Sequence, residues 1–284
     1  MTTNRCRNRR AVLSFSRALH AEWLRLRRSS LIALHAALSL ALGLAAGLYF
    51  AMTPWNSLLG YDAFVQLLGA GAPLLAGIAC GLAIDVEREA GEYANLLGQP
   101  SRRCALAAKG MMLLMLGALP CLCAIALFVG VMAAAGRPLP DPAAIAASFI
   151  GVVAGSIVLY ALLIAAALAW GRNAAIGLGA LGFMCALASL GGLGNGLVTG
   201  TLSAALAPFF LMAVPFVWPT RLASLAVELF IAKTGAIPGA VEAFDALLHN
   251  AYISVSLCLV GTVAIVGALL AGANRFEGAH RINE

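Results

Sequence analysis

The stretch that decides the fold is LIALHAALSLALGLAAGLYF, residues 31–50, twenty consecutive residues without Asp, Glu, Lys or Arg. An α-helix rises about 1.5 Å per residue, so this stretch covers the roughly 30 Å hydrocarbon core of a bilayer. The rest of the chain is similar in character, because 62% of its 284 residues are hydrophobic and 11% are charged. A soluble domain carries about 25% charged residues. The sequence therefore predicts an integral membrane protein.

Five further stretches are as apolar and long enough to cross. The predicted spans are residues 31–50, 63–84, 111–134, 143–170, 174–193 and 251–273, none of which contains a charged residue. Strands of an open sheet would leave backbone polar groups unpaired in lipid, so the spans are expected to be helices. The predicted fold is all-α, a polytopic membrane protein whose single transmembrane domain covers residues 1–284 and has six spans.

A seventh apolar segment, residues 203–217, is interrupted by two prolines, Pro208 and Pro215, and followed by a third, Pro219. Fifteen residues of broken helix are short for a crossing. We interpret the segment as a re-entrant or interfacial hairpin within an outer-side segment, residues 195–250. A kinked seventh span is the alternative.

The distribution of positive charge predicts the orientation. With the N-terminus inside, fifteen of the 18 Lys and Arg residues fall on the inner side, including those of the basic segment 1–30 and the tail 274–284. Short cytoplasmic loops carry the excess of Lys and Arg. We therefore expect a bacterial-type plasma membrane protein with both termini in the cytoplasm. Contact with anionic lipid explains the basic excess without a nucleic-acid partner.

The segment before the first span, SFSRALHAEWLRLRRSS (residues 14–30), has the pattern of an amphipathic helix. Its apolar face carries Phe15, Leu19, Trp23 and Leu26. Such a helix lies on the membrane surface, with Trp23 at the interface. Glu22 falls at the edge of the apolar face, and Arg25, three residues later, is its expected ion-pair partner. An ordinary basic flank of the first span is the alternative.

The second polar segment is DVEREAGEYANLLGQPS, residues 85–101, between the second and third spans. A helix would place on one apolar face Val86, Ala90, Tyr93 and Leu97. Gly91 favours a bend, Gly98 and Pro100 end the helix, and Ser101 can cap the next one. We expect a short helix held at the membrane surface by its two fixed ends.

Together these segments resemble the permease subunits of type-2 ABC exporters. The resemblance rests on HAEWLRLRRS (20–29), EREAGEYANLLGQPSRR (87–103), Lys109 at the start of the third span, and FFLMAVPFVWPTRL (209–222). Within that superfamily the chain is most similar to the lantibiotic-immunity permeases, in which a run of Glu, Gly, an aromatic residue, Asn, Leu and Leu follows the second span.

The resemblance implies a permease that a separate ABC ATPase energises, with ATP bound on that partner, and a second permease chain that is identical or related. Segment 85–101 would then be the coupling helix that docks on the ATPase. The residues expected to make this contact are Glu87, Glu89, Glu92, Tyr93, Leu96 and Leu97. The implied substrate is a lantibiotic-like peptide or another amphipathic molecule, expelled from the membrane. Its candidate contacts are Phe209, Phe210, Phe216 and Trp218.

Other classes of function lack their motifs. Neither lysine of the chain, Lys109 or Lys233, follows a glycine, so the G-x-x-x-x-G-K-[ST] phosphate loop is absent. The sequence has no H-E-x-x-H or G-x-S-x-G motif. We therefore predict no catalytic, cofactor-binding or metal-binding residue, which disfavours the alternative of a membrane-embedded enzyme. A secondary transporter is a further alternative, disfavoured because no predicted span contains a carboxylate.

Pairs of glycines four residues apart occur in three spans: Gly43 and Gly47, Gly77 and Gly81, and Gly151 and Gly155. Such pairs let two membrane helices approach closely. From the sequence, the approaching helix can belong to the same chain or to a second chain.

Overall fold

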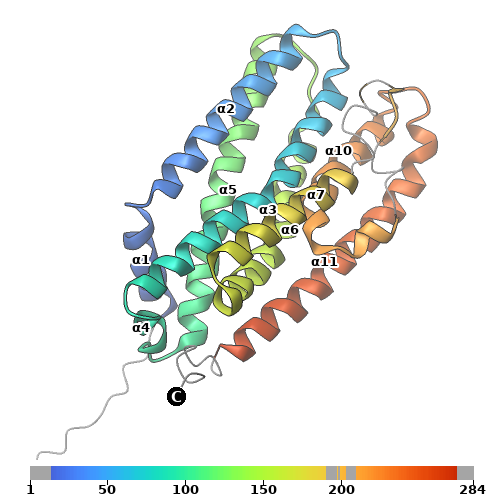
Figure 1. Cartoon of the computed structure of the whole chain (residues 1–284). Coiled ribbons are helices and arrows are strands. Elements are labelled where there is room, and N and C mark those ends of the chain that lie inside the picture. Colours follow the sequence, from blue (N-terminus) through green and yellow to red (C-terminus); the bar gives the residue numbers. More distant parts are fainter. Residues whose placement is uncertain (1–13, 190–196, 198, 203–208, 274–284) are drawn as a thin grey trace, which may run out of the picture.

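The computed structural model describes residues 14–189, 197, 199–202 and 209–273, and these form a bundle of long helices without a strand (Figure 1). The all-α prediction is confirmed. Within the described residues, seven helices are long and apolar enough to cross a membrane. They are α2 (Ser30–Met52), α3 (Ser57–Glu89), α5 (Arg102–Ala134), α6 (Pro142–Trp170), α7 (Arg172–Ser189), α10 (Trp218–Thr234) and α11 (Phe244–Gly272).

Over the described residues, each of the six predicted spans coincides with one of these helices, and residues 190–193 of the span 174–193 lie outside them. Most of the helices are longer than the uncharged runs. α3 begins before Asp62 and continues past Asp85, and α5 begins at Arg102. Charged residues can extend a membrane helix where other groups of the protein pair with them. The pattern of uncharged runs predicts no helix at α10, because this helix contains Arg221, Glu228 and Lys233.

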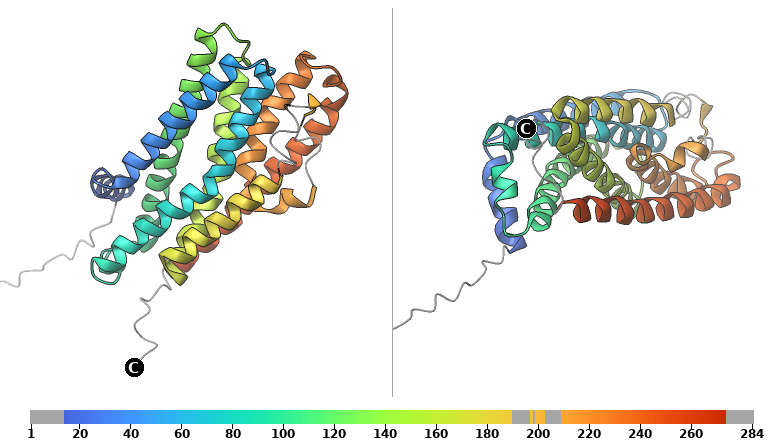
Figure 2. Two further views of the ribbon diagram at one scale, coloured as in Figure 1. Left: turned by 45° about the horizontal axis from the view of Figure 1, so that its top comes forward. Right: turned by 60° about the horizontal axis from the view of Figure 1, so that its bottom comes forward.

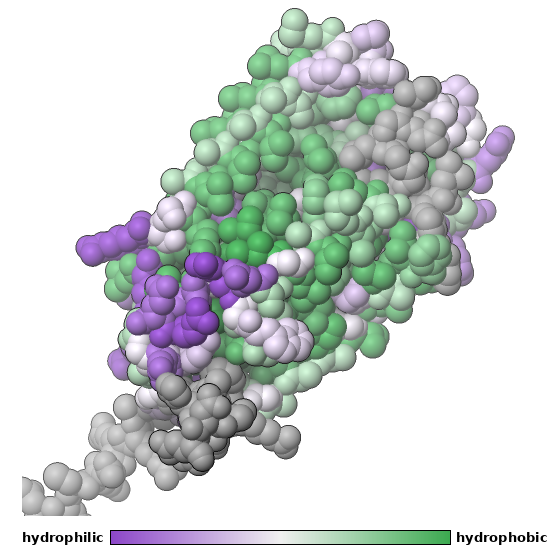
Figure 3. Space-filling model, in the orientation of Figure 1, coloured by the Kyte–Doolittle hydropathy of each residue, from purple (hydrophilic) through white to green (hydrophobic). Residues whose placement is uncertain are grey.

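Short helices gather at one end of the bundle. α1 (Phe15–Leu26) and the single turn α4 (Ala94–Leu97) lie there, beside the end of α11 (Figures 1 and 2). In the space-filling view of Figure 3, hydrophilic residues are concentrated at this end, and a broad hydrophobic surface covers the middle of the molecule. This distribution is that of a protein whose middle lies in lipid. We call this end the α1–α4 end.

The glycine pairs lie at close contacts between helices, and all three contacts are within this one chain. Gly43 and Gly47 face α5, Gly77 and Gly81 face α7, and Gly151 and Gly155 face α10. A Cβ atom added to Gly43 would lie 2.7 Å from the Ala124 carbonyl oxygen, and one added to Gly155 would lie 2.6 Å from the Pro219 nitrogen. Both distances are shorter than van der Waals contact, so only glycine permits these approaches.

Helix α10 begins inside the bundle. Its first residue, Trp218, is 3% exposed, covers Gly261 of α11 and donates from Nε1 to the Met212 carbonyl oxygen at 2.8 Å. Gly155 and Gly261 both lie near the middle of their helices, so α10 starts at mid-depth and runs to the end at which α3 begins. The short 3₁₀ segments Phe209–Ala213 and Pro215–Val217 precede it. Residues 203–208 of the predicted hairpin lie outside the described residues, and the count of six crossings stays a prediction.

Candidate functional site

Four charged side chains meet at the α1–α4 end and join α1, α3 and α5. Lys109 Nζ lies 2.7 Å from Glu22 Oε2 and 3.1 Å from Glu87 Oε1. Arg25 Nη1 lies 2.9 Å from Glu22 Oε1 and 2.6 Å from Glu87 Oε1. The expected pair of Glu22 and Arg25 is therefore confirmed, and it belongs to a larger unit. We call these four residues the charge cluster.

The middle of the charge cluster is shielded from solvent. The side chains of Lys109 and Glu87 are each 5% exposed, that of Glu22 is 14% exposed, and that of Arg25 is 44% exposed. Removing one partner of a buried ion pair costs about 3–5 kcal/mol, because the remaining charge stays out of water. The exposed guanidinium of Arg25 lowers this cost. The charge cluster therefore ties α1 to the ends of α3 and α5.

A second set of ion pairs ties α3 to α7. Asp85 accepts from Arg88 at 2.6 Å and from Arg172 at 2.9 Å, and its side chain is 7% exposed. Arg172 is the first residue of α7 and follows Gly171, whose φ of 88° reverses the chain after α6. The end of α3 is thus held on two sides, by the charge cluster and by Arg172.

The loop between α3 and α5 has a strained backbone. Gly91, Glu92 and Tyr93 have φ values of 123°, 51° and 67°. A left-handed conformation is unfavourable for residues other than glycine, by roughly 1–2 kcal/mol each. The Tyr93 N–H donates to the Glu87 carbonyl oxygen at 3.1 Å, and the Ser101 side chain accepts from the Cys104 N–H. The predicted bend at Gly91 and cap at Ser101 are both confirmed.

This bend changes what the loop exposes. Tyr93 and Leu96, expected to face a partner, are 8% and 7% exposed and pack in one hydrophobic cluster with Ile84 and Leu106. Burial raises the pKa of the Tyr93 phenol, and this effect outweighs the neighbouring charges, of which Arg88 lowers the pKa. The expectation that Tyr93 and Leu96 are exposed is therefore wrong. The reversal at Gly91 turns their apolar face back onto the ends of α3 and α5.

The other residues of this loop that were expected to contact the ATPase are partly buried and partly exposed. Glu87 is 4% exposed and belongs to the charge cluster, so it does not lie on an outer surface as expected. Glu89 and Glu92 are exposed. The side chain of Leu97 lies outside the described residues. On α1, Trp23 is 46% exposed, as a residue at the membrane interface would be.

The aromatic residues expected to contact substrate are also dispersed. Trp218 is buried and holds the start of α10, so it is not available as a contact. Phe216 is half-buried and packs against Gly182 of α7. Phe210 is 73% exposed, and the side chain of Phe209 lies outside the described residues.

Sequence reasoning missed a buried polar cluster at the far end of the bundle. Asp62 accepts from Gln66 Nε2 at 2.6 Å and from Ser224 Oγ at 2.8 Å, and Glu228 lies next to Ser224. Asp62 is 4% exposed and Glu228 is fully buried. Neither acid lies in a predicted span, because α3 begins at Ser57, before the predicted span 63–84, and α10 was not predicted. The missed signal was the spacing of four residues from Asp62 to Gln66 and from Ser224 to Glu228, which places each pair on one helix face.

Comparison with known proteins identifies one family. The family described as ABC-2 family transporter protein matches residues 18–189, which include the charge cluster, the loop and α2 to α7. No curated protein and no solved structure was found to match the chain. Among the described residues, no group of three or more His, Cys, Asp or Glu side chains could hold a metal ion.

Proposed function

Because this chain belongs to the ABC-2 family of transporter proteins and is the permease subunit of an ABC transporter, we propose that its α1–α4 end receives the partner ATPase. This end carries the loop between α3 and α5, and positive charge predicts that it is cytoplasmic. Glu89 and Glu92 are the exposed acids of the loop. They are the contacts we propose for the ATPase, with Leu97 as an apolar contact beside them.

The charge cluster is the observation that supports a coupling role for this end. Tyr93 and Leu96 anchor the loop on the bundle, and the cluster joins the end of α3 to α1 and α5. Asp85 joins the same end to α7. A force on the loop would therefore move several helices together, because buried ion pairs resist separation more than a flexible loop does.

We propose export of a lantibiotic-like peptide or another amphipathic molecule from the membrane. The resemblance of segments 87–103 and 209–222 to the lantibiotic-immunity permeases supports this proposal, and Phe210 is the aromatic residue of that region exposed for a contact. We also propose a plasma membrane location with six crossings and cytoplasmic termini. The mid-depth start of α10 and the shared position of α1 and the end of α11 support this topology.

The transporter is proposed to contain a second permease chain, identical or related. The three glycine pairs are already used for contacts within this chain. Another surface must then contact the second permease. α11 is the least buried of the candidate spans, with Tyr252, Val255 and Val260 exposed on it.

The buried acids Asp62 and Glu228 favour one second candidate, ion-coupled transport, because intramembrane carboxylates often mark ion pathways. The purified chain in liposomes, without an ATPase, distinguishes the two functions. Uptake or efflux driven by a pH or sodium gradient alone would support ion coupling. We expect transport only with the partner ATPase and ATP.

A substitution at Lys109 tests the coupling role. The permease and its ATPase are purified together, and ATPase binding and ATP-driven efflux are measured separately. Lys109→Met should leave the ATPase bound and lower efflux per bound ATPase at least about fivefold. Lys109→Arg should retain more efflux than Lys109→Met, and Lys233→Met, which removes an exposed lysine at the end of α10, is the matched control. Normal efflux by a well-folded Lys109→Met protein would overturn the proposal.

A further inference from the structure

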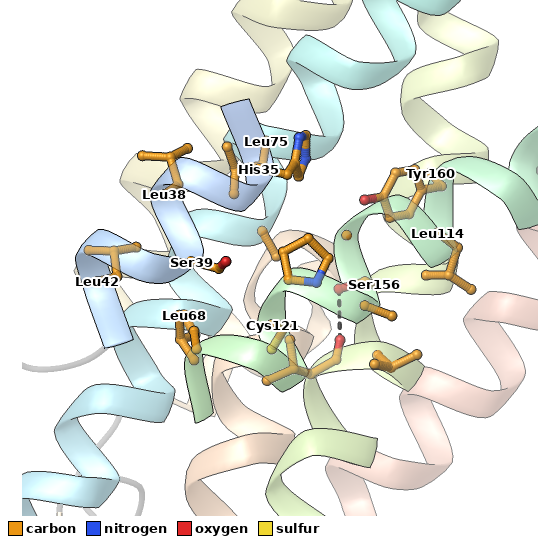
Figure 4. Close-up of a pocket in the computed structure, with 17 residues that line it drawn as sticks. His35, Leu38, Ser39, Leu42, Leu68, Leu75, Leu114, Cys121, Ser156 and Tyr160 are labelled. Atoms are coloured by element: carbon orange, nitrogen blue, oxygen red, sulfur yellow. Dashed lines mark hydrogen bonds between the residues drawn. The ribbon is translucent and has the colours of Figure 1, made fainter. Parts of the chain in front are cut away.

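A cavity of about 70 Å³ lies inside the bundle between α2, α3, α5 and α6, apart from the charge cluster (Figure 4). Most of its 17 lining residues are apolar, and none is an acid, lysine or arginine. Binding sites for small molecules are usually concave, mainly apolar and fitted with a few polar groups. In this cavity the polar side chains that can hydrogen-bond a ligand are His35 and Tyr160.

His35 on α2 offers a hydrogen-bond acceptor. Its Nδ1 lies 2.8 Å from the Leu31 carbonyl oxygen. A carbonyl only accepts, so Nδ1 carries the proton, and Nε2 of the neutral ring is left as an acceptor. This Nε2 atom is buried without a hydrogen-bond partner, and the residue is 2% exposed. A buried polar atom without a partner is unfavourable, and a ligand that donates to it removes the cost.

Tyr160 on α6 offers a hydroxyl to the same cavity. Gly117 of α5 leaves room for this group, since a Cβ atom there would collide with Tyr160 Oη. Within the part of the chain that the structure describes, this hydroxyl makes no hydrogen bond. Figure 4 shows its oxygen turned into the cavity, toward the side on which His35 lies.

The two serines of the cavity are already bonded. Ser39 donates to the Ala36 carbonyl oxygen at 2.9 Å, and Ser156 donates to the Val152 carbonyl oxygen at 2.7 Å. The remaining capacity is therefore the Tyr160 hydroxyl and the covered acceptor His35 Nε2, both on residues that line the same apolar space. A ligand hydroxyl group is complementary to this pair, because it can donate to one and accept from the other.

We propose that this cavity binds an uncharged, hydroxyl-bearing amphiphile. The ligand hydroxyl donates to His35 Nε2 and accepts from Tyr160 Oη. A charged head group is disfavoured, because the cavity has no opposite charge to compensate for lost hydration. A ligand of this kind differs from the cationic peptide proposed as the exported substrate. Its binding can be measured on the permease alone, without the ATPase.

The size of the cavity determines how the ligand lies. The volume holds the head group and a few methylene groups, so the rest of the chain must leave toward lipid. Leu42 is 36% exposed and Leu38 is half-buried, and α2 packs closely on α5 while barely touching α3. The tail therefore leaves between α2 and α3. Because His35 Nε2 is covered, Leu75, which Figure 4 shows beside the imidazole, must shift when the ligand binds.

Photolabelling of the purified chain in phosphatidylcholine nanodiscs tests the proposal. The probe is a long-chain primary alcohol with a diazirine in its tail, and labelled peptides are identified by mass spectrometry. We expect labels on cavity-lining residues of α2, α5 and α6. Excess hexadecanol should compete, whereas hexadecyltrimethylammonium and hexadecanoate should not. Equal competition by all three would show simple partitioning and overturn the proposal.

Matched variants locate the head group. Tyr160→Phe removes one oxygen atom, and His35→Leu removes the acceptor, so each should lower competable labelling about tenfold. His35→Gln restores an acceptor and should label more strongly than His35→Leu. His249→Leu changes an exposed histidine of α11 and should label like the wild type. If His35→Leu misfolds, the test rests on Tyr160→Phe. Labelling of a folded Tyr160→Phe protein at the wild-type level would overturn the proposal.

Discussion

Replacing Gly155 by alanine tests the contact that places α10 inside the bundle. The added Cβ atom would lie 2.6 Å from the Pro219 nitrogen, 2.7 Å from the Trp218 carbonyl carbon and 2.8 Å from the Pro219 Cα. All three are backbone atoms, so no flexible side chain can yield. Carbon atoms in contact normally lie about 3.5–4.0 Å apart. The start of α10 must therefore move away from α6 by roughly an ångström.

The expected cost follows from this displacement. Overpacking a well-packed interior costs about 1–3 kcal/mol. Alanine in a helix is favoured over glycine by about 1 kcal/mol, which offsets part of the cost. Gly130→Ala in α5 is the matched control, because a Cβ atom there meets nothing within 4 Å. The propensity gain is common to both variants, so their stabilities should differ by the overpacking cost alone, about 1–3 kcal/mol.

The assay is reversible unfolding in mixed micelles, with far-ultraviolet circular dichroism as the readout of helix content. Gly155→Ala should unfold at a lower denaturing-detergent fraction than the wild type, and Gly130→Ala at the same or a higher fraction. Gly69→Ala, whose Cβ atom would lie 2.5 Å from the Thr220 Cα, repeats the test from α3. If Gly155→Ala and Gly130→Ala unfold at the same denaturing-detergent fraction, α10 does not approach α6 as closely as the structure shows.

Three further predictions concern other regions. Asp62→Leu should lower the unfolding free energy by about 1–3 kcal/mol, because Gln66 Nε2 and Ser224 Oγ each lose one acceptor. Asp62→Asn should cost less, because it keeps an acceptor and removes the negative charge beside Glu228. Equal losses in the micelle assay would contradict this account. Glu89→Lys should weaken co-purification of the ATPase, because exposed charges mainly tune association. Asp245→Lys on α11 is the matched control, and full ATPase recovery with Glu89→Lys would argue against docking on this loop. A reporter fused after Arg275 should be cytoplasmic and one after Lys233 external, and an external tail would exclude six crossings.

Several features were predictable because they depend on residues close together in the chain. Residues 31–50 alone predict a membrane helix, since desolvation of backbone and side chains decides that outcome locally. The pair of Glu22 and Arg25 needs one helical turn, and the bend at Gly91 and the cap at Ser101 follow from the residues themselves. The helix predicted within residues 14–30 corresponds to α1, for the same reason.

The sequence did not indicate α10 as a helix. A search for uncharged runs passes over a helix that contains Arg221 and Glu228, and such residues are stable in a membrane bundle only where other helices surround them. In this fold α10 packs among α3, α6 and α11, and Glu228 is fully buried there. The glycines of α3 and α6 that make room for α10 lie far from it in the chain.

In the candidate site, too, the features that the sequence could not predict depend on residues that are distant in the chain. From the sequence alone Lys109 is only a lysine at the start of a span, because its partners Glu22 and Glu87 lie 87 and 22 residues away. Packing of α1 on α5 brings them together, and the left-handed turn at residues 91–93 buries Tyr93 and Leu96. Hydropathy and positive charge thus determined the membrane class and predicted the orientation, since both depend on local transfer energies. Tertiary packing decided which charges pair and which apolar residues stay exposed, since both depend on neighbours that are distant in sequence.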